Sequence, residues 1–110
     1  MAHTLFTIKK RSTFVTIRKD GDFIRGKNMN LQILHNQSLE NSIGVGYTAS
    51  KKIGNAVKRN KAKRIMRELA RKIIINGKIN SYYVLIAKSS LLDEKFDKLI
   101  EELKDKINDK

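Results

Sequence analysis

Residues 50–72 read SKKIGNAVKRNKAKRIMRELARK and carry ten basic residues against one acid, Glu68. The apolar residues recur at the spacing of one helix face, which predicts a buried stripe of Ala62, Ile65, Met66, Leu69 and Ile73. The opposite side of this helix would carry Asn60, Lys63, Arg64, Arg67 and Arg71, with Arg59 and Lys61 on its flanks. A core face combined with a face of Arg and Lys is typical of a phosphate-binding helix. A merely solvated charged face is the alternative, and the near absence of acids disfavours it.

Both ends of this helix can be read from the sequence. Gly54 interrupts any preceding element, and Asn55 is a favourable N-cap because its side-chain oxygen can accept from amides of the first turn. Asn76 and Gly77 are the expected stop. The prediction is a helix from roughly Asn55 to Ile75, about 30 Å long.

The string from Ser50 to Glu68 closely resembles the signature of the bacterial ribonuclease P protein subunit. In that family Ser-Lys-Lys, Gly and Ala-Val lead into Arg-Asn-Arg, followed by Lys-Arg and Arg-Glu. Lys61 departs from the pattern by replacing the second Arg, which keeps the charge but loses the bidentate fork. Ala62 departs by replacing a larger aliphatic residue. The resemblance covers about residues 9 to 107.

This resemblance implies a ribonucleoprotein in which an RNA subunit, with magnesium, removes the 5′ leader of precursor tRNA. The protein would bind the leader and the catalytic RNA without holding a cofactor. Residues implied for the leader cleft are Phe14, Asn30, Gln32, Arg59, Asn60, Lys63 and Arg67. Residues implied to meet the catalytic RNA or nearby phosphates are Lys51, Lys52, Lys61, Arg64 and Arg71. Arg18 stands where many members carry a second aromatic, so cationic contact would partly replace stacking there.

Length and charge bound the function independently of the resemblance. The 110 residues suit a single RNA-binding domain, and the formal net charge of +13 indicates a nucleic acid or another anionic partner. Residues 1–90 hold 19 basic and 4 acidic residues, whereas residues 91–110 hold 5 and 7, so the RNA-facing surface should lie in the first part. The chain has no cysteine, which suits the cytoplasm, and neither a membrane-spanning nor a secretory segment is predicted.

The first quarter of the chain predicts one short helix. Residues 1–11 show little periodicity and read as a mobile basic lead-in. Ser12 is the expected N-cap of a helix that reaches Lys19 and is stopped by Asp20 and Gly21. Phe14 and Ile17 share a face of that helix, so Phe14 is either a core residue, which periodicity favours, or a platform for stacking a base.

The remaining segments predict strands and a final helix. Residues 22–27 suggest a short strand, alternation over 28–35 predicts a half-buried strand, and 36–41 read as a hairpin loop leading to a strand at 43–49. In that last strand Gly44 and Gly46 permit close backbone approach. Residues 81–87 predict a central strand and 92–107 an amphipathic helix. The fold class is α+β, a single-domain α-β sandwich of order α-β-β(-β)-α-β-α, in which the long basic helix and the terminal helices lie on a small mixed sheet.

The sequence offers no catalytic or metal-binding pattern. His3 and His35 lack partners at ligand spacing, and the carboxylates cluster in the last segment between lysines, so no catalytic residue, metal ligand or small-molecule substrate is predicted. Besides the ribonuclease P subunit, two hypotheses remain. A ribosomal or general RNA-binding protein would explain the charge but not the Ser50–Glu68 string. A stand-alone protein nuclease would need a metal site.

Overall fold

The computed structural model describes residues 3–108, and it has a five-stranded sheet and three α-helices. In chain order the elements are β1 (Leu5–Thr7), α1 (Arg11–Asp20), β2 (Asp22–Ile24), β3 (Met29–Leu34), β4 (Ile43–Thr48), α2 (Ala56–Lys72), β5 (Ser81–Ala87) and α3 (Phe96–Asn108). Short 3₁₀ helices occur at Lys51–Ile53, Ile74–Asn76 and Ser89–Asp93. This arrangement confirms the predicted α+β class.

The sheet is mixed and its strand order is β1-β4-β5-β3-β2. β4 pairs in parallel with both β1 and β5, whereas β3 pairs antiparallel with β5 and β2. The long basic helix α2 connects the neighbouring parallel strands β4 and β5. β5 is therefore the central strand, as its continuous apolar run predicts.

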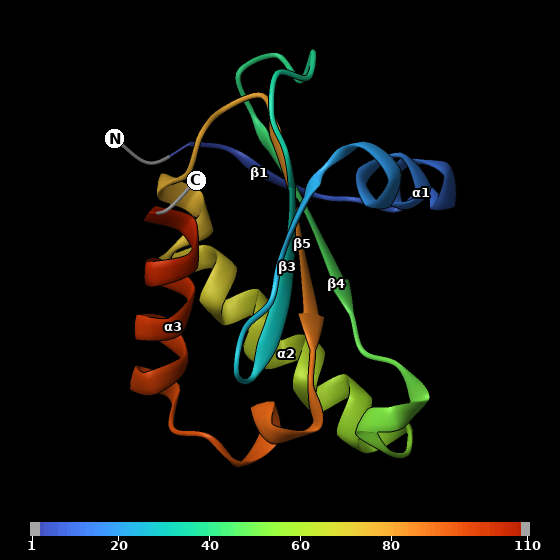
Figure 1. Ribbon diagram of the computed structural model, residues 1–110, viewed down its shortest axis with the longest axis vertical. Helices are drawn as coiled ribbons and strands as arrows, with labels where there is room; N and C mark the ends of the chain where they lie inside the picture. Colours follow the sequence, from blue (N-terminus) through green and yellow to red (C-terminus); the bar gives the residue numbers. More distant parts are fainter. Residues whose placement is uncertain (1–2, 109–110) are drawn as a thin grey trace.

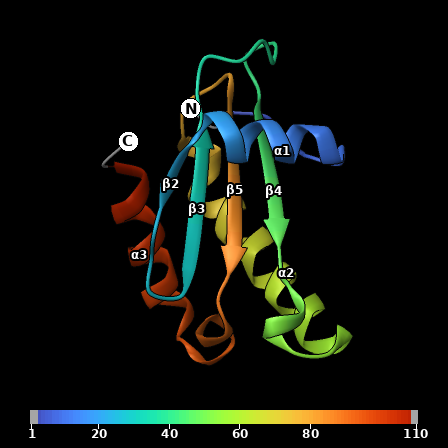
Figure 2. The same ribbon diagram turned by 45° about the vertical axis from the view of Figure 1, so that its right-hand side comes forward.

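Helices cover the two faces of the sheet unequally. α2 and α3 lie against one face, where the main core includes Leu31, Val45, Leu69, Leu85 and Leu103. α1 lies against the other face, over a smaller cluster of buried side chains (Ile8, Ile17 and Val84). Figures 1 and 2 show that α1 crosses only one end of that face, so the strands continue beyond it without a covering helix.

The predicted register of α2 is confirmed. Ala62, Met66 and Leu69 are fully buried, whereas Arg67 and Arg71 on the opposite side are exposed. The helix ends at Lys72, earlier than the predicted Ile75, because the last turn tightens into the 3₁₀ helix Ile74–Asn76. The Asn55 cap is also confirmed, since its Oδ1 accepts from the Lys58 amide at 3.0 Å.

The N-terminal segment differs from the expected lead-in. Leu5–Thr7 form edge strand β1, and Ile8 is buried beneath α1. The Ser12 cap is wrong, because α1 begins at Arg11 and the preceding Lys10 makes no side-chain capping bond. Ser12 lies inside the first turn, where its carbonyl accepts from the Thr16 hydroxyl at 3.1 Å. The part of the lead-in prediction that concerns residues 1–2 lies outside the described residues.

The final helix is shorter than predicted at its start. α3 begins at Phe96, whereas Leu92 belongs to the 3₁₀ helix Ser89–Asp93, which is anchored by the fully buried Leu91. Glu94 is extended, with φ −89° and ψ 150°, and so separates the two helices. Apolar spacing alone could not detect this break, because the residues on either side of it pack against the same core.

Candidate nucleic-acid interface

The sheet face under α1 is ordered in rows set by the strand register. Residues paired across neighbouring strands point to the same side of a sheet. One row contains Phe6, Gly44, Tyr82 and Leu34; the next contains Gly46, Val84, Gln32 and Phe23; the third contains Thr48, Ile86 and Asn30. α1 crosses one end of this face (Figure 2). Beside it, Gln32 and Val84 of the second row and Thr48 and Ile86 of the third row form the floor of an open depression.

This depression, which we call the groove, has a volume of about 580 Å³. Its walls come from α1 and the segment before it on one side and from α2 on the other, and its floor comes from β3, β4 and β5. The lining residues are Lys9, Arg11, Phe14, Val15, Arg18, Gln32, Tyr47, Thr48, Ala49, Lys63, Val84 and Ile86. An apolar floor framed by cations suits a strand whose bases lie on the sheet and whose phosphates face outward.

Phe14 fits both roles that the sequence leaves open, that of a core residue and that of a platform for stacking a base. Its half-buried ring packs on the cluster that contains Ile17 and Val84, and it also lines the groove. The ring lies over Gly46, where an added Cβ would be only 2.8 Å from Phe14 Cζ. The glycine therefore lets an aromatic ring rest on the strand backbone, which is the close approach that the sequence indicated, although the approaching group is a side chain.

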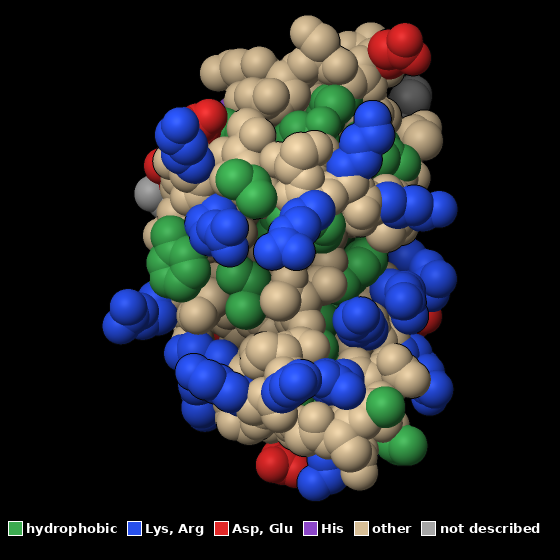
Figure 3. Space-filling view, turned by 90° about the vertical axis from the view of Figure 1, so that its right-hand side faces the viewer, with side chains coloured by type: hydrophobic (Ala, Val, Ile, Leu, Met, Phe, Trp, Pro, Cys, Tyr) green, Lys and Arg blue, Asp and Glu red, His purple; other side chains and the backbone are tan. Residues whose placement is uncertain are grey.

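The charges around the groove are of one sign. Lys9, Arg11, Arg18 and Lys63 line it, and its lining includes no carboxylate. Figure 3 shows the surrounding surface, where Lys and Arg side chains are spread across the face with hydrophobic groups between them. Such a surface attracts a polyanion over a distance and offers it contacts at close range.

The residues implied for the leader cleft fall into three groups. Phe14, Gln32 and Lys63 meet in the groove. Asn30 lies one row further along, in a neighbouring hollow lined by Lys52 and Lys88 among others, and its Oδ1 accepts from the Gly26 amide at 3.1 Å. The rest of this set, outside the groove lining on α2, are Arg59, Asn60 and Arg67.

Tyr47 joins Arg67 to the groove. The Arg67 guanidinium lies 5.8 Å from the centre of the Tyr47 ring, which is itself a lining residue. Burial raises the pKa of the Tyr47 phenol above its ordinary value, and the positive charges of Arg67 and Arg71 reduce that rise. The phenol therefore stays neutral near neutral pH and can donate a hydrogen bond.

The side chains of the second predicted set are exposed to solvent. Its members are Lys51, Lys52, Lys61, Arg64 and Arg71. Within the described part of the chain, the only ion pair that these side chains form joins Arg71 to Glu68 at 2.6 Å, on a solvent-exposed surface where such a pair contributes little to stability.

The uncharged residues of the Ser50–Asn55 segment hold this basic surface in place. Ser50 Oγ accepts from the Lys52 amide at 3.3 Å, and Ile53 is buried in the core. Gly54 has a φ of +138°, a backbone conformation that residues with a side chain rarely adopt. The chain then enters α2 at the Asn55 cap. The segment therefore presents Lys51 and Lys52 to solvent from a fixed turn.

Several lining residues were not among the predicted site residues. They include Lys9 and Arg11, which fall in the predicted lead-in, and Tyr47, which falls in the strand predicted at 43–49. They also include Arg18, for which the family resemblance implies only the replacement of an aromatic. Tyr47 lies beyond Val45, where the pairing of β4 with β1 ends, and this long-range pairing leaves no local signal in the sequence.

Two carboxylates of the C-terminal segment, those of Glu94 and Glu102, hold this segment to the rest of the fold. Glu102 on α3 accepts from the Asn28 amide at 3.0 Å and from the Asn28 side chain at 2.9 Å, and so ties α3 to the start of β3. Glu94 lies beside the same asparagine. Hydrogen bonds lower the pKa of Glu94 below its ordinary value, and the bond from the Lys95 backbone amide contributes most.

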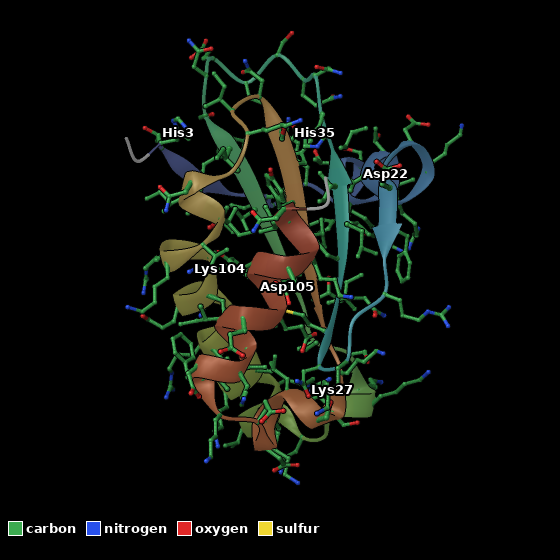
Figure 4. All side chains as sticks on the ribbon, turned by 60° about the vertical axis from the view of Figure 1, so that its left-hand side comes forward. His3, Asp22, Lys27, His35, Lys104 and Asp105 are labelled. Atoms are coloured by element: carbon green, nitrogen blue, oxygen red, sulfur yellow. The ribbon has the colours of Figure 1, made fainter. Side chains whose placement is uncertain are left out.

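The histidines lie apart (Figure 4): His3 precedes β1 and His35 follows β3. His35 Nδ1 is 2.6 Å from Ser81 Oγ, and its ring contacts Tyr83 edge-on. Within residues 3–108, no three His, Cys, Asp or Glu side chains gather in a way that could hold a metal ion. No helix in the same range is long and apolar enough to cross a membrane.

Together, the fold and the groove define a small basic α+β protein whose open sheet face is suited to a polyanionic strand. Comparison with known proteins makes the assignment more specific. A family model described as Ribonuclease P matches residues 3–109. The chain belongs to the ribonuclease P protein family.

Individual relatives agree with this assignment. The ribonuclease P protein component of Bartonella quintana (strain Toulouse) is 37% identical over 112 residues, covering 94% of this chain and 81% of the relative. That of Caulobacter vibrioides (strain NA1000 / CB15N) is 33% identical over 98 residues, covering 88% of this chain. The match spans 65% of the Caulobacter protein's length.

Solved structures agree on the fold. The ribonuclease P protein of Staphylococcus aureus superposes with a TM-score of 0.79 at 26% identity, covering 94% of this chain and 93% of that one. The protein of Thermotoga maritima gives 0.81 at 21% identity, covering 96% and 97%, and at that identity the likeness concerns the fold alone.

Proposed function

We propose that this chain is the protein subunit of a ribonuclease P, and that it assists a catalytic RNA in removing the 5′ leader from precursor tRNA in the cytoplasm. The observation that carries the proposal is the groove, in which Phe14, Gln32 and Lys63 meet on the open sheet face of a chain from this family. The described residues would act as one RNA-binding domain.

In this proposal the single-stranded leader lies in the groove. The apolar floor and the Phe14 ring receive bases, while Lys9, Arg11, Arg18 and Lys63 neutralise phosphates. Base stacking tolerates any sequence, because every base has a flat face. A leader site built in this way would accept many precursors, which suits an activity that acts on more than one tRNA.

The exposed basic side chains of α2 and of the turn before it would contact the RNA subunit. These residues are Lys51, Lys52, Lys61, Arg64 and Arg71, all exposed to solvent, and Arg59, Asn60 and Arg67 on the same helix would extend this contact toward the groove. The protein would thus hold the leader beside the catalytic RNA. Magnesium bound by the RNA would activate water and stabilise the leaving oxygen, while the protein's side chains bind and orient.

Reconstitution tests the proposal directly. The chain should restore cleavage of a leader-bearing precursor by a bacterial ribonuclease P RNA at a magnesium concentration where the RNA alone is inactive. Lys63→Ala should weaken this rescue, whereas Lys104→Ala, on the exposed side of α3, should not. Equal stimulation of an unrelated ribozyme would instead favour a general RNA-binding protein. Cleavage by the chain without any RNA would favour a protein nuclease.

A further inference from the structure

A second hollow flanks α1 on the side away from the groove. It has a volume of about 410 Å³ and is lined by Phe6, Thr7, Ile8, Lys9, Lys10, Thr13, Leu39 and Tyr82. Thr13 faces this hollow, while Phe14 and Arg18 of the same helix face the groove. Lys9 lines both, so the two depressions meet at the start of α1.

Aromatic surface is the distinctive feature of this hollow. The rings of Phe6 and Tyr82 are 6.4 Å apart in an edge-to-face arrangement, and both lie over Gly44, which leaves room for them. Phe6 keeps 39% of its surface exposed, although it lies on an ordered strand. An exposed aromatic on a rigid strand presents a flat surface at little entropic cost, which is how single-strand binding proteins stack bases.

The charges around this hollow also favour single-stranded nucleic acid as its occupant. Lys9 and Lys10 frame the hollow, and no carboxylate lines it. Along the strands, the row that contains Phe6 and Tyr82 is two residues from the row that floors the groove, a separation of about 7 Å. A strand leaving the groove past Lys9 would therefore reach these rings directly.

We propose that this hollow is a second base-binding site, in which Phe6 and Tyr82 hold a nucleotide of the same single-stranded RNA further from the groove. The inference rests on the proposed function insofar as the groove holds a leader. It adds a length requirement, since only a strand long enough to pass around Lys9 would fill both sites. Long leaders should then bind more tightly than short ones.

Binding of labelled single-stranded RNA to the full chain tests the proposal. Affinity is measured by fluorescence anisotropy for a series from about 4 to about 16 nucleotides, the range of known single-strand sites. The wild-type chain should gain affinity in two steps as length increases. Phe6→Leu keeps apolar packing but removes the flat ring, so it should lose only the second step, about five- to a hundredfold for long RNA.

Further variants separate stacking from folding. Phe6→Trp should restore the second step, and Lys10→Gln, at an exposed position, should weaken it without changing the melt. Ile79→Ala removes a side chain of similar exposure, 37%, outside both hollows, and should match the wild type at every length. If Phe6→Leu follows the wild type at every length, or weakens all lengths equally, the proposal is overturned. The same holds if the wild-type chain forms dimers in solution that Phe6→Leu dissociates while RNA binding is unchanged.

Cleavage assays distinguish this inference from the proposed function. The reconstituted enzyme is given precursors with short and with long leaders, and Phe6→Leu should lower the apparent affinity only for the long ones. If the wild-type chain rescues cleavage but Phe6→Leu has no length-dependent effect, the second site fails and the subunit role stands. If the wild-type chain fails to rescue cleavage but shows the two-step oligonucleotide binding, the subunit role fails and the second site stands.

Discussion

At the scale of single residues, two glycines of β4 determine where aromatic rings can rest. An added Cβ on Gly44 would be 2.6 Å from the Tyr82 ring and 2.8 Å from Phe6, and one on Gly46 would meet Phe14. Both glycines lie on the open face, opposite the buried side chains of Ile43 and Val45. The Gly-x-Gly pattern therefore serves ring packing, and it has no part in a nucleotide-binding loop.

Gly46→Ala should displace the Phe14 ring into the groove. We expect weaker leader binding and a loss of about 1–3 kcal/mol in the free energy of unfolding, which is typical of overpacking. Thermal melts and RNA affinity measure the two effects. A double-mutant cycle with Phe14→Ala provides the control, because Gly46→Ala should change affinity little once the ring is absent. Additive losses of affinity would contradict this account.

Arg67→Ala should separate binding from stability. The Arg67 side chain is exposed and contacts Tyr47 through a cation–π interaction worth about 0.5–1 kcal/mol at such a site, so the melt should change little. RNA affinity should fall, and the slope of log affinity against log salt should decrease by about 0.7 for one lost phosphate of a single strand. Arg67→Lys should recover the slope more fully than the affinity. A collapsed melt would show that the assigned register of α2 is wrong.

At the scale of elements, α2 buries its apolar side in the core and exposes its basic side to solvent. Leu69 is fully buried near the middle of the apolar stripe. Leu69→Asp should place an unpaired charge in the core at a cost of several kcal/mol, against a typical domain stability of about 5–15 kcal/mol. The free protein should lose its cooperative melt and support the catalytic RNA weakly.

The matched control introduces the same side chain on the exposed side of the helix. Lys61→Asp should keep the cooperative melt, because Lys61 is exposed. The pair of variants is followed by circular dichroism during heating. An unchanged melt for Leu69→Asp would mean that α2 folds only on RNA, as a disordered basic arm would.

Elements with strong local periodicity could be predicted, and features that depend on distant pairing could not. The buried stripe of α2 and the central strand β5 follow from their own residues. β1 has only three residues and exists because it pairs with β4, some forty positions away. Tyr47 lines the groove because β1 pairs only as far as Val45. Phe14, Gln32 and Lys63 could be predicted as neighbours only through the family resemblance.

At the scale of the whole molecule, charge is divided between two regions. Residues 1–90 carry 19 basic and 4 acidic residues, and residues 91–110 carry 5 and 7. The segment that follows β5 is held to the fold by carboxylates such as Glu102, while the groove and the exposed side of α2 remain cationic. The molecule should therefore approach RNA in one preferred orientation.

The salt dependence of RNA binding tests this division of charge between the two regions. Log affinity for precursor RNA should fall linearly with log salt, with a slope of about −0.7 to −0.9 for each phosphate neutralised. Replacing Lys98 and Lys104 on α3 by Gln should leave the slope unchanged, whereas replacing Lys63 and Arg64 on α2 should reduce it. A nearly flat salt response of the wild-type chain would rule out phosphate contacts as the main source of affinity.

The central position of β5 also determines the order in which the chain can fold during synthesis. β4 and β3 are each paired to β5 and not to each other, so the sheet cannot form until residue 87 has left the ribosome. Until then the ten basic residues of 50–72 are displayed on a nascent chain without a core to hold them. Pairing between segments so far apart in sequence is slow compared with helix formation. The newly made protein therefore passes through an unfolded, strongly cationic stage beside the RNA of the ribosome before its binding surface exists.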